Sequence, residues 1–191
     1  MELQFDAEKH EFRYGDQPVV SVTQALHGAG LVDAGNFSQW CAWRGSVVHR
    51  CCELDDLGTL DDATVADEAW PYLLAWRAFR RESGFVPDLI EHQVFNRAWG
   101  YAGILDRTGT IGQMRLVVDL KTGAPQKWHA LQLAAYCMTL DKPRLYRRFV
   151  VGLRNDGTYA AKEFEGLVDK DFAVFTAALT VANWIRTNGK H

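Results

Sequence analysis

The chain has 191 residues, of which 48% are hydrophobic, and this composition excludes a disordered protein and favours one globular domain that spans residues 1–191. No apolar run approaches the roughly 20 residues of a membrane helix, the charged N-terminus has no signal-peptide core, and the four cysteines form no CxxC pair. We therefore expect a cytoplasmic protein in a reducing compartment, without a membrane partner.

The net charge of −3 is distributed unevenly along the chain. Residues 1–68 hold 4 Lys/Arg against 13 Asp/Glu, whereas residues 69–191 hold 17 against 11. The second part therefore has the basic excess that a polyanionic partner would need. A solvated acidic loop at residues 53–68 would skew the count in the same way, so the distribution alone leaves both explanations open.

The first segments predict a short β-hairpin followed by a helix. Residues 3–14 and 18–22 are apolar around the turn sequence GDQP, which is typical of two strands and their connection. Thr23 is placed to begin a brief helix that ends near Gly28.

Two longer helices are predicted next, on either side of the acidic stretch. Residues 36–56 contain no proline, and Asn36 or Ser38 is placed to cap the helix. Residues 53–68 are the stretch that we expect to be flexible. Residues 68–83 predict the second helix.

The remaining segments predict a sheet. Three strand candidates, at 88–96, 100–108 and 114–122, are separated by glycine-bearing turns, as in an antiparallel meander. Three further elements follow: a helix at 126–140, a hairpin at 145–164 whose turn contains Asp156-Gly157, and an amphipathic helix at 170–187. This order predicts an α/β (α+β) domain in which helices flank a central mixed sheet.

Asp119 and Lys121 stand out in the apolar stretch LVVDLKTG. Side chains alternate along a strand, so both lie on one face together with Val117. The opposite face, directed into a core, has Leu116, Val118 and Leu120. Charged groups are costly to place on a mostly apolar strand, so they indicate either a functional site or a compensating partner. Taken alone, an ion pair at the end of a sheet is commoner than a functional site.

Asp106 ends the preceding strand and strengthens the case for a metal site. If the two strands pair across residues 108–113, Asp106 and Asp119 converge, and their carboxylates repel unless a cation lies between them. Oxygen ligands of this kind favour Mg²⁺ or Mn²⁺, and the Leu120 carbonyl could be a further ligand. A divalent cation beside Lys121 suits phosphodiester hydrolysis, because the metal polarises the phosphate and the lysine orients water or stabilises charge.

Four other residues are weaker candidates. His49 lies in the middle of a predicted helix with Gly45 one turn earlier, where a close approach of another backbone or a ligand is possible, and Glu91 lies in a strand. Gln132 and Tyr136 share a helix face and could position the lysine or contact a DNA phosphate. Taken alone, each is more often an ordinary core or surface residue.

These signals occur in one order: RGSVVH, a strand Glu, GYAGILD, VVDLKTG and QLAAY. That order resembles the PD-(D/E)XK nuclease superfamily, in particular its RecB-like branch, and the N-terminal FDAEKHEFRYGDQPVVSVTQAL is similar to the start of phage-type exonucleases of that branch. The resemblance covers most of the chain, up to the C-terminal hairpin and helix. It implies a restriction-endonuclease-like core with a mixed sheet flanked by helices.

The resemblance also implies roles for particular residues. Metal would be bound by His49, Asp106, Asp119 and the Leu120 carbonyl, and Lys121 would be the catalytic lysine. Gln132 and Tyr136 would support the site and the DNA, and Glu91 matches a frequently acidic position of the catalytic group.

One or two Mg²⁺ or Mn²⁺ ions are the implied cofactor. Some RecB-like nucleases hold an iron–sulfur cluster with a C-terminal cysteine group, but no cysteine follows Cys137, so we expect no cluster. A zinc site from Cys41, Cys51 and Cys52 with His49 is disfavoured, because adjacent cysteines fit poorly into one tetrahedron.

The expected partner is DNA, as ends or single strands with weak sequence preference, because no base-reading motif occurs. Arg144, Arg147 and Arg148 could contact phosphates. Trp99, Tyr101 and Trp128 could stack on unpaired bases, although the core is the commoner place for such residues. No GxxxxGK[ST] motor motif occurs, so a helicase or recombination partner, or action on ends alone, is expected.

The sequence thus predicts an Mg²⁺- or Mn²⁺-dependent deoxyribonuclease, an exonuclease of recombination, repair or phage DNA processing. One alternative is a non-catalytic DNA-binding or regulatory protein that keeps the same fold. Another is a structure-selective endonuclease, which the sequence does not separate from an exonuclease.

Overall fold

A mixed eight-stranded sheet organises the part of the chain that the computed structural model describes, residues 2–7, 9–32 and 39–189. Its strands are β1 (Leu3–Asp6), β2 (Glu11–Tyr14), β3 (Gln17–Ser21), β4 (Val86–Asn96), β5 (Tyr101–Ile111), β6 (Met114–Lys121), β7 (Tyr146–Leu153) and β8 (Tyr159–Glu163). The helices are α1 (Val22–Gly28), α2 (Gln39–Asp56), α3 (Trp70–Ser83), α4 (His129–Cys137) and α5 (Val168–Asn188), with 3₁₀ turns at Asp62–Thr64 and Pro143–Leu145. The predicted central mixed sheet flanked by helices is confirmed.

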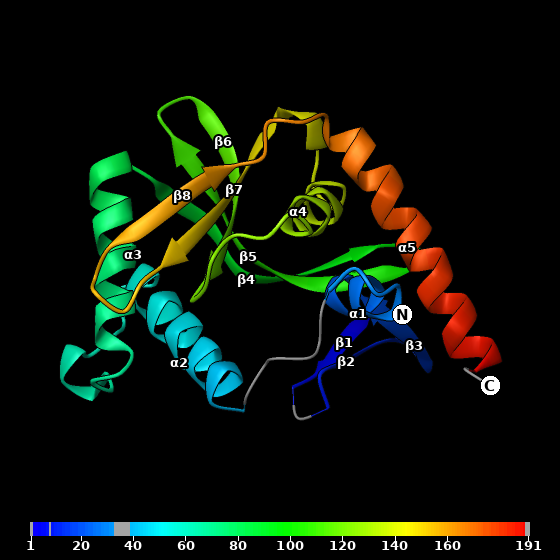
Figure 1. Cartoon of the computed structure of the whole chain (residues 1–191), viewed down its shortest axis with the longest axis horizontal. Helices are drawn as coiled ribbons and strands as arrows, with labels where there is room; N and C mark the ends of the chain where they lie inside the picture. The colour runs from blue at the N-terminus through cyan, green and yellow to red at the C-terminus, as the bar shows by residue number, and fades with distance from the viewer. Residues whose placement is uncertain (1, 8, 33–38, 190–191) are drawn as a thin grey trace.

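Helices lie on both faces of the sheet (Figure 1), and each face has its own hydrophobic core. On one face α1, α4 and α5 cover Val117 of β6 and Val150 of β7. On the other face α2 and α3 cover the β6 residues Leu116, Val118 and Leu120. The predicted alternation of β6 is therefore correct, and it follows from the period of two along a strand.

The pairing of the strands follows the predicted meander and continues beyond it. β5 pairs antiparallel with both β4 and β6, β6 pairs parallel with β7, and β7 pairs antiparallel with β8. The β7–β8 turn is closed by Asp156, whose Oδ1 accepts from the Thr158 amide, and Gly157 supplies the positive φ of 80°. The predicted hairpin with its Asp-Gly turn is confirmed.

The edge of β5 that faces away from β4 is shared by two strands. β3 pairs there with Tyr101 and Ala102, and β6 pairs with Arg107–Ile111. No described strand pairs with residues 103–106 on this edge. The sheet is therefore forked at this point, and Asp106 lies where the fork opens.

Two N-terminal expectations need correction. The predicted hairpin is a three-stranded meander, because the chain turns between β1 and β2, where His10 has a φ of 55°. α1 starts one residue before Thr23, with Ser21 as its N-cap: the Ser21 hydroxyl accepts from the Gln24 amide, and the Gln24 side chain accepts from the Ser21 amide. Asn36 and Ser38, the predicted caps of α2, lie outside the described residues.

The acidic stretch at 53–68 begins in the last turn of α2 and continues through exposed residues that include Asp61, Asp67 and Glu68. Asp55 forms ion pairs with Arg77 and Arg80, and Asp56, whose side chain is 0% exposed, forms them with Arg80 and Arg107. Two carboxylates of the stretch are thus neutralised within the fold, and its exposed acidic residues still contribute to the uneven charge of the chain. None of the helices in the described ranges is long and apolar enough to cross a membrane.

Candidate active site

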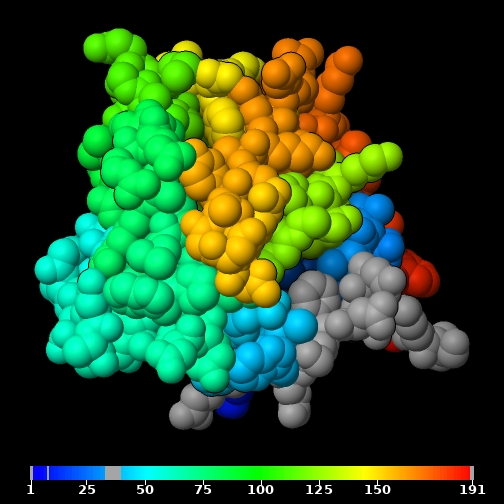
Figure 2. Space-filling view, turned by 60° about the vertical axis from the view of Figure 1, so that its left-hand side comes forward, coloured from blue at the N-terminus to red at the C-terminus, as the bar shows by residue number. Residues whose placement is uncertain are grey.

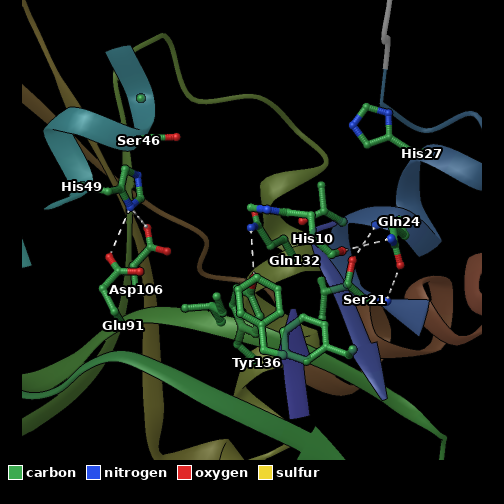
Figure 3. Close-up of a pocket in the computed structure, with 17 residues that line it drawn as sticks. His10, Ser21, Gln24, His27, Ser46, His49, Glu91, Asp106, Gln132 and Tyr136 are labelled. Carbon is green, nitrogen blue, oxygen red and sulfur yellow. Dashed lines mark hydrogen bonds and ion pairs between the residues drawn. The ribbon is translucent and has the colours of Figure 1, made fainter. Parts of the chain in front are cut away.

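Three side chains from separate elements meet beside the fork in the sheet. His49 comes from α2, Glu91 from β4 and Asp106 from β5, and their ligand atoms all lie within 4.8 Å of one another. His49 Nδ1 lies 3.3 Å from Glu91 Oε1 and 3.7 Å from Asp106 Oδ2. Figure 3 shows the imidazole directed toward both carboxylates. One imidazole and two carboxylates at this spacing can bind a divalent cation.

The end of β6 is tied into the same group through its backbone. His49 Nε2 donates to the Leu120 carbonyl at 3.0 Å, and the Leu120 amide donates to Asp106 Oδ2 at 2.7 Å. The fork allows this, because the β5–β6 pairing begins only at Arg107. The Asp106 carboxylate accepts from the Leu120 amide at the open end of the two strands. The Leu120 carbonyl, a predicted ligand, therefore lies at the site.

Asp119 and Lys121 form an ion pair in which Asp119 is buried and Lys121 is partly exposed. Lys121 Nζ lies 2.6 Å from Asp119 Oδ2, and Asp119 is 1% exposed. Its Oδ1 has no hydrogen-bond partner among the described residues. Asp119 is not one of the three residues whose ligand atoms meet, so its predicted sharing of a metal with Asp106 stays a prediction.

The ionisable side chains of the site shift one another's pKa values. Burial lowers the pKa of His49, but the carboxylates of Asp106 and Glu91 outweigh this and raise it to about 9. Burial raises the pKa of Asp119 to about 6, in part offset by Lys121. For Lys121, burial lowers the pKa, and Asp119 and Asp106 together hold it above its usual value. The site is thus an acidic pocket that favours positive charge.

Arg107 holds Glu91 in place, and sequence analysis did not find it. Its Nη1 donates to Glu91 Oε1 at 2.9 Å and to the Asp106 carbonyl at 2.6 Å, and its Nε donates to Asp56 Oδ2 at 2.6 Å. Glu91 itself has a φ of 44°, a conformation that costs roughly 1–3 kcal/mol in a non-glycine residue. An arginine inside the apolar strand next to Asp106 was the signal available in the sequence.

Gln132 and Tyr136, from α4, line the same cavity as His49, and their support of the lysine and the DNA stays a prediction. Gln132 Nε2 lies 3.4 Å from the Tyr136 hydroxyl, to which it donates, and Gln132 Oε1 has no hydrogen-bond partner within the described ranges. Gly103 lets the tyrosine ring approach β5, because an added Cβ would lie 2.8 Å from Tyr136 Cε1. Gly45 has no such role, since an added Cβ there meets no atom within 4 Å.

A cavity of about 630 Å³ extends from the His49 group along these residues. One wall is α2 with Gly45 and Ser46, and the other is α1 together with the β1–β2 meander (Figure 3). Phe5, His10 and Phe12 contribute to that second wall, and Gln132 and Tyr136 also line the cavity. Metal-ligating groups at one end and aromatic rings at the other suit a nucleotide chain.

The adjacent cysteines of α2 are packed in a hydrophobic core. Cys52 is fully buried and Cys51 nearly so in the core between α2 and α3. The groups near His49 that could bind a metal are the carboxylates of Glu91 and Asp106.

The expected base-stacking role of three aromatic residues is not supported. Tyr101 is fully buried, and its hydroxyl donates to the Ala135 carbonyl at 2.8 Å. Trp99 is half exposed but packs edge-on against Phe172, and Trp128 lies against His129. None of the three lines the cavity that contains His49.

The expectation that Arg148 contacts DNA is wrong. Its side chain is 2% exposed and donates to Asp171 and to the carbonyls of Ala130, Phe164 and Gly166. Arg147 forms an ion pair with Glu163 and pairs in the sheet with Leu116, five residues before Lys121 on β6. Arg144 forms an ion pair with Asp169. Arg147 and Arg148 thus connect β7 to β8, α4 and α5, and Arg144 connects the 3₁₀ turn before β7 to α5.

Comparisons with known proteins add little to this geometry. No family model and no curated protein sequence matches this chain. Among solved structures, the crystal structure of LHK-Exo in complex with dAMP matches with a TM-score of 0.35 and 13% identity, over 88% of this chain and 92% of that chain. A likeness at that level does not establish the activity or the family of this protein.

Proposed function

We propose that this protein is a metal-dependent deoxyribonuclease, an exonuclease of the RecB-like branch of the PD-(D/E)XK superfamily. The observation that carries the proposal is the meeting of His49, Glu91 and Asp106 with the Leu120 carbonyl, next to the ion pair of Asp119 and Lys121. These residues come from α2, β4, β5 and β6, and the order of their motifs is the one on which the resemblance rests.

The donor set fits Mg²⁺ or Mn²⁺. His49, Asp106, Asp119 and the Leu120 carbonyl would hold the ion, with Glu91 beside them. Asp119 Oδ1 supports this set, because a buried carboxylate oxygen without a partner is costly unless something binds it. A divalent cation there would supply the Lewis acid that polarises a phosphodiester and makes water a better nucleophile.

The side chains of the chain have separate tasks in this proposal. Lys121 stays protonated at neutral pH, because Asp119 and Asp106 raise its pKa, so it stabilises negative charge that develops on the phosphate and does not act as a base. Glu91, fixed by Arg107, holds His49 in position. Gln132 and Tyr136 line the path of the strand.

The cavity supports a single strand as the substrate. Its volume of about 630 Å³ is that of a small-molecule pocket, so it accepts a few nucleotides of one strand and not a duplex. A strand that enters from a DNA end satisfies this condition, which is why we propose an exonuclease, alone or with a helicase or recombination partner.

A cleavage assay tests the proposed function. Linear and covalently closed circular DNA are incubated with Mg²⁺, Mn²⁺ or EDTA and with the wild type, Lys121→Ala or the control Lys127→Ala, which changes an exposed lysine. We expect metal-dependent loss of linear DNA, reduced about 10²–10³-fold in Lys121→Ala and unchanged in the control.

Three results would contradict parts of the proposal. Equal activity of Lys121→Ala and wild type would remove Lys121 from the mechanism. Cutting of closed circles would make the enzyme an endonuclease. DNA binding without cleavage in either metal would favour the non-catalytic protein.

A further inference from the structure

A second cavity, of about 380 Å³, lies next to the end of β6 and shares no lining residue with the first. It lies between the start of α2, the loop that follows Lys121, and the β7–β8 hairpin. Figure 2 shows these segments side by side on one face, with the light-blue helix below the yellow-orange hairpin and the yellow-green loop. Its lining consists of Arg44, Tyr72, Thr122–Pro125, Gly152–Asn155 and Ala160; we name it the Arg44 cavity.

The charged side chains in the described lining of the Arg44 cavity are all cationic. Arg44 and Arg154 line it, and no Asp or Glu belongs to the described residues of its lining. The Arg44 guanidinium lies 5.5 Å from the centre of the Tyr72 ring, and its buried Nε has no hydrogen-bond partner in the described part of the chain. Arg154 donates to the Thr158 hydroxyl. Hydrogen bonds from Thr158, together with the charge of the nearby Arg154, lower the pKa of Asp156, so Arg44 is the guanidinium that lacks the anion it prefers among the described residues.

Other arginines of α2, α3 and β5 are used differently. Arg50, Arg77, Arg80 and Arg107 each form an ion pair with a carboxylate. In Arg44 the ring of Tyr72 takes the place of a carboxylate, which holds the guanidinium in position and leaves its charge available. This contrast points to an anionic ligand that is absent from the chain itself.

The position of the cavity connects it with the proposed cleavage site. Thr122 and Gly123 follow Lys121 directly, and Gly152 is the sheet partner of Lys121. Gly152 also holds the loop close, because an added Cβ would lie 3.2 Å from the Gly123 carbonyl oxygen. On α2, Arg44 precedes Gly45, which lines the first cavity. An anion in the Arg44 cavity is therefore a near neighbour of Lys121.

We propose that the Arg44 cavity is a phosphate subsite that holds a DNA phosphate flanking the one cleaved beside Lys121. This inference rests on the proposed nuclease function. The planar guanidinium group of arginine can donate two parallel hydrogen bonds to phosphate oxygens. Phosphate contacts fix the position of a strand without reading its sequence. Free phosphate or a mononucleotide has the same chemistry as the strand, so the experiment separates these sources.

The test measures binding of a fluorescent single-stranded oligonucleotide by anisotropy in EDTA, over a series of salt concentrations. Wild type is compared with the double variant Arg44→Ala/Arg154→Ala and with Arg115→Ala. Arg115 is a matched control, because it lies over the Tyr146 ring and near the opposite end of β6. We expect the double variant to bind at least about 10-fold more weakly and to lose up to about 1.4 of the salt slope, at 0.7 per phosphate.

A charge-preserving pair, Arg44→Lys/Arg154→Lys, guards against misfolding and should retain most of the salt slope. Inorganic phosphate, titrated as a competitor, should displace the oligonucleotide from wild type and have no specific effect on the alanine pair. Equal affinity and slope in the alanine pair and Arg115→Ala would overturn the subsite. Binding of inorganic phosphate without any change in DNA affinity would assign the cavity to a free anion and would also overturn it.

The same experiment separates this inference from the proposed function. If wild type binds and cleaves DNA while the alanine pair behaves like wild type, only the subsite fails. If wild type neither binds nor cleaves DNA with Mg²⁺ or Mn²⁺, the proposed function fails, and the subsite fails with it.

Discussion

At the scale of single residues, Arg107 shows how a buried side chain positions the candidate site. It is fully buried and joins Asp56 at the end of α2 to Glu91 beside His49. A buried ion pair of this kind contributes little net stability, but removal of one partner leaves the other charge buried and uncompensated. The residue that positions the site is therefore also one on which folding depends.

Substitution of Arg107 should be severe. We expect Arg107→Met to lower the free energy of unfolding by about 3–5 kcal/mol, because Asp56 and Glu91 would lose their shared cation. Urea unfolding measures this, with Arg81→Met as the control, since Arg81 forms only an exposed pair with Glu82 and should change stability by about 0.5 kcal/mol or less. Equal stability of the two variants would show that the buried network does not hold the fold.

His129 predicts a pH dependence of stability. Burial, with Lys121 and Lys162, lowers its pKa to about 3, and its Nδ1 accepts from the Gln126 amide at 2.9 Å. The unfolded chain, with a His pKa near 6.5, binds the proton more readily than the folded chain. Stability from this residue is therefore fully present above about pH 6.5 and falls as the pH drops, by at most about 1.4 kcal/mol per pH unit.

The variant His129→Asn isolates this effect, because the amide oxygen can still accept the hydrogen bond and does not titrate. Unfolding free energies are measured between pH 7.5 and 5 for both proteins. Wild type should lose more stability than the variant over this range. Parallel curves would mean that His129 is not kept neutral by the fold.

At the scale of elements, the fork between β3 and β6 creates the site. It leaves the edge of β5 unpaired at residues 103–106, so that Asp106 can bind the Leu120 amide and Tyr136 can pack over Gly103. α2 supplies both His49 and Arg44, so one helix borders the candidate active site and the Arg44 cavity.

Gly103→Ala tests the close approach of α4 to β5. The added Cβ would lie 2.8 Å from the Tyr136 ring, and overpacking of this kind costs about 1–3 kcal/mol. Gly45→Ala is the control, because its Cβ meets no atom within 4 Å and alanine favours a helix by about 1 kcal/mol over glycine. Thermal unfolding should place Gly103→Ala below wild type and Gly45→Ala at or above it; the reverse order would contradict the packing described.

Local patterns in the sequence were enough to predict most elements but not their long-range contacts. The faces of β6 followed from alternation, and the β7–β8 turn followed from Asp156 and Gly157. The fork did not follow, because β3 pairs with β5 in parallel across about 80 residues of chain. Sequence also could not tell that Arg148 is buried, since the carbonyls that surround it belong to α4 and to the segment after β8.

At the scale of the whole molecule, charge is divided between the interior and two cavities. Asp55 and Asp56 at the end of α2, and Asp62 after it, pair with arginines of α3 and β5, which neutralises part of the N-terminal acidity. What remains near the end of β6 is an acidic group of His49, Glu91 and Asp106 on one side and the cationic Arg44 cavity on the other. A metal ion and a phosphodiester strand together complement this arrangement.

The most direct test of the central claim is calorimetric titration of Mn²⁺ into the protein without DNA. We expect saturable binding by wild type, its loss in Asp106→Asn, and its retention in Asp88→Asn, which alters an exposed carboxylate on β4. Bound ion at 100 times its Kd should also stabilise wild type by about 2.7 kcal/mol. Absence of Mn²⁺ binding to wild type, or equal binding by wild type and Asp106→Asn, would contradict a metal site at His49, Glu91 and Asp106.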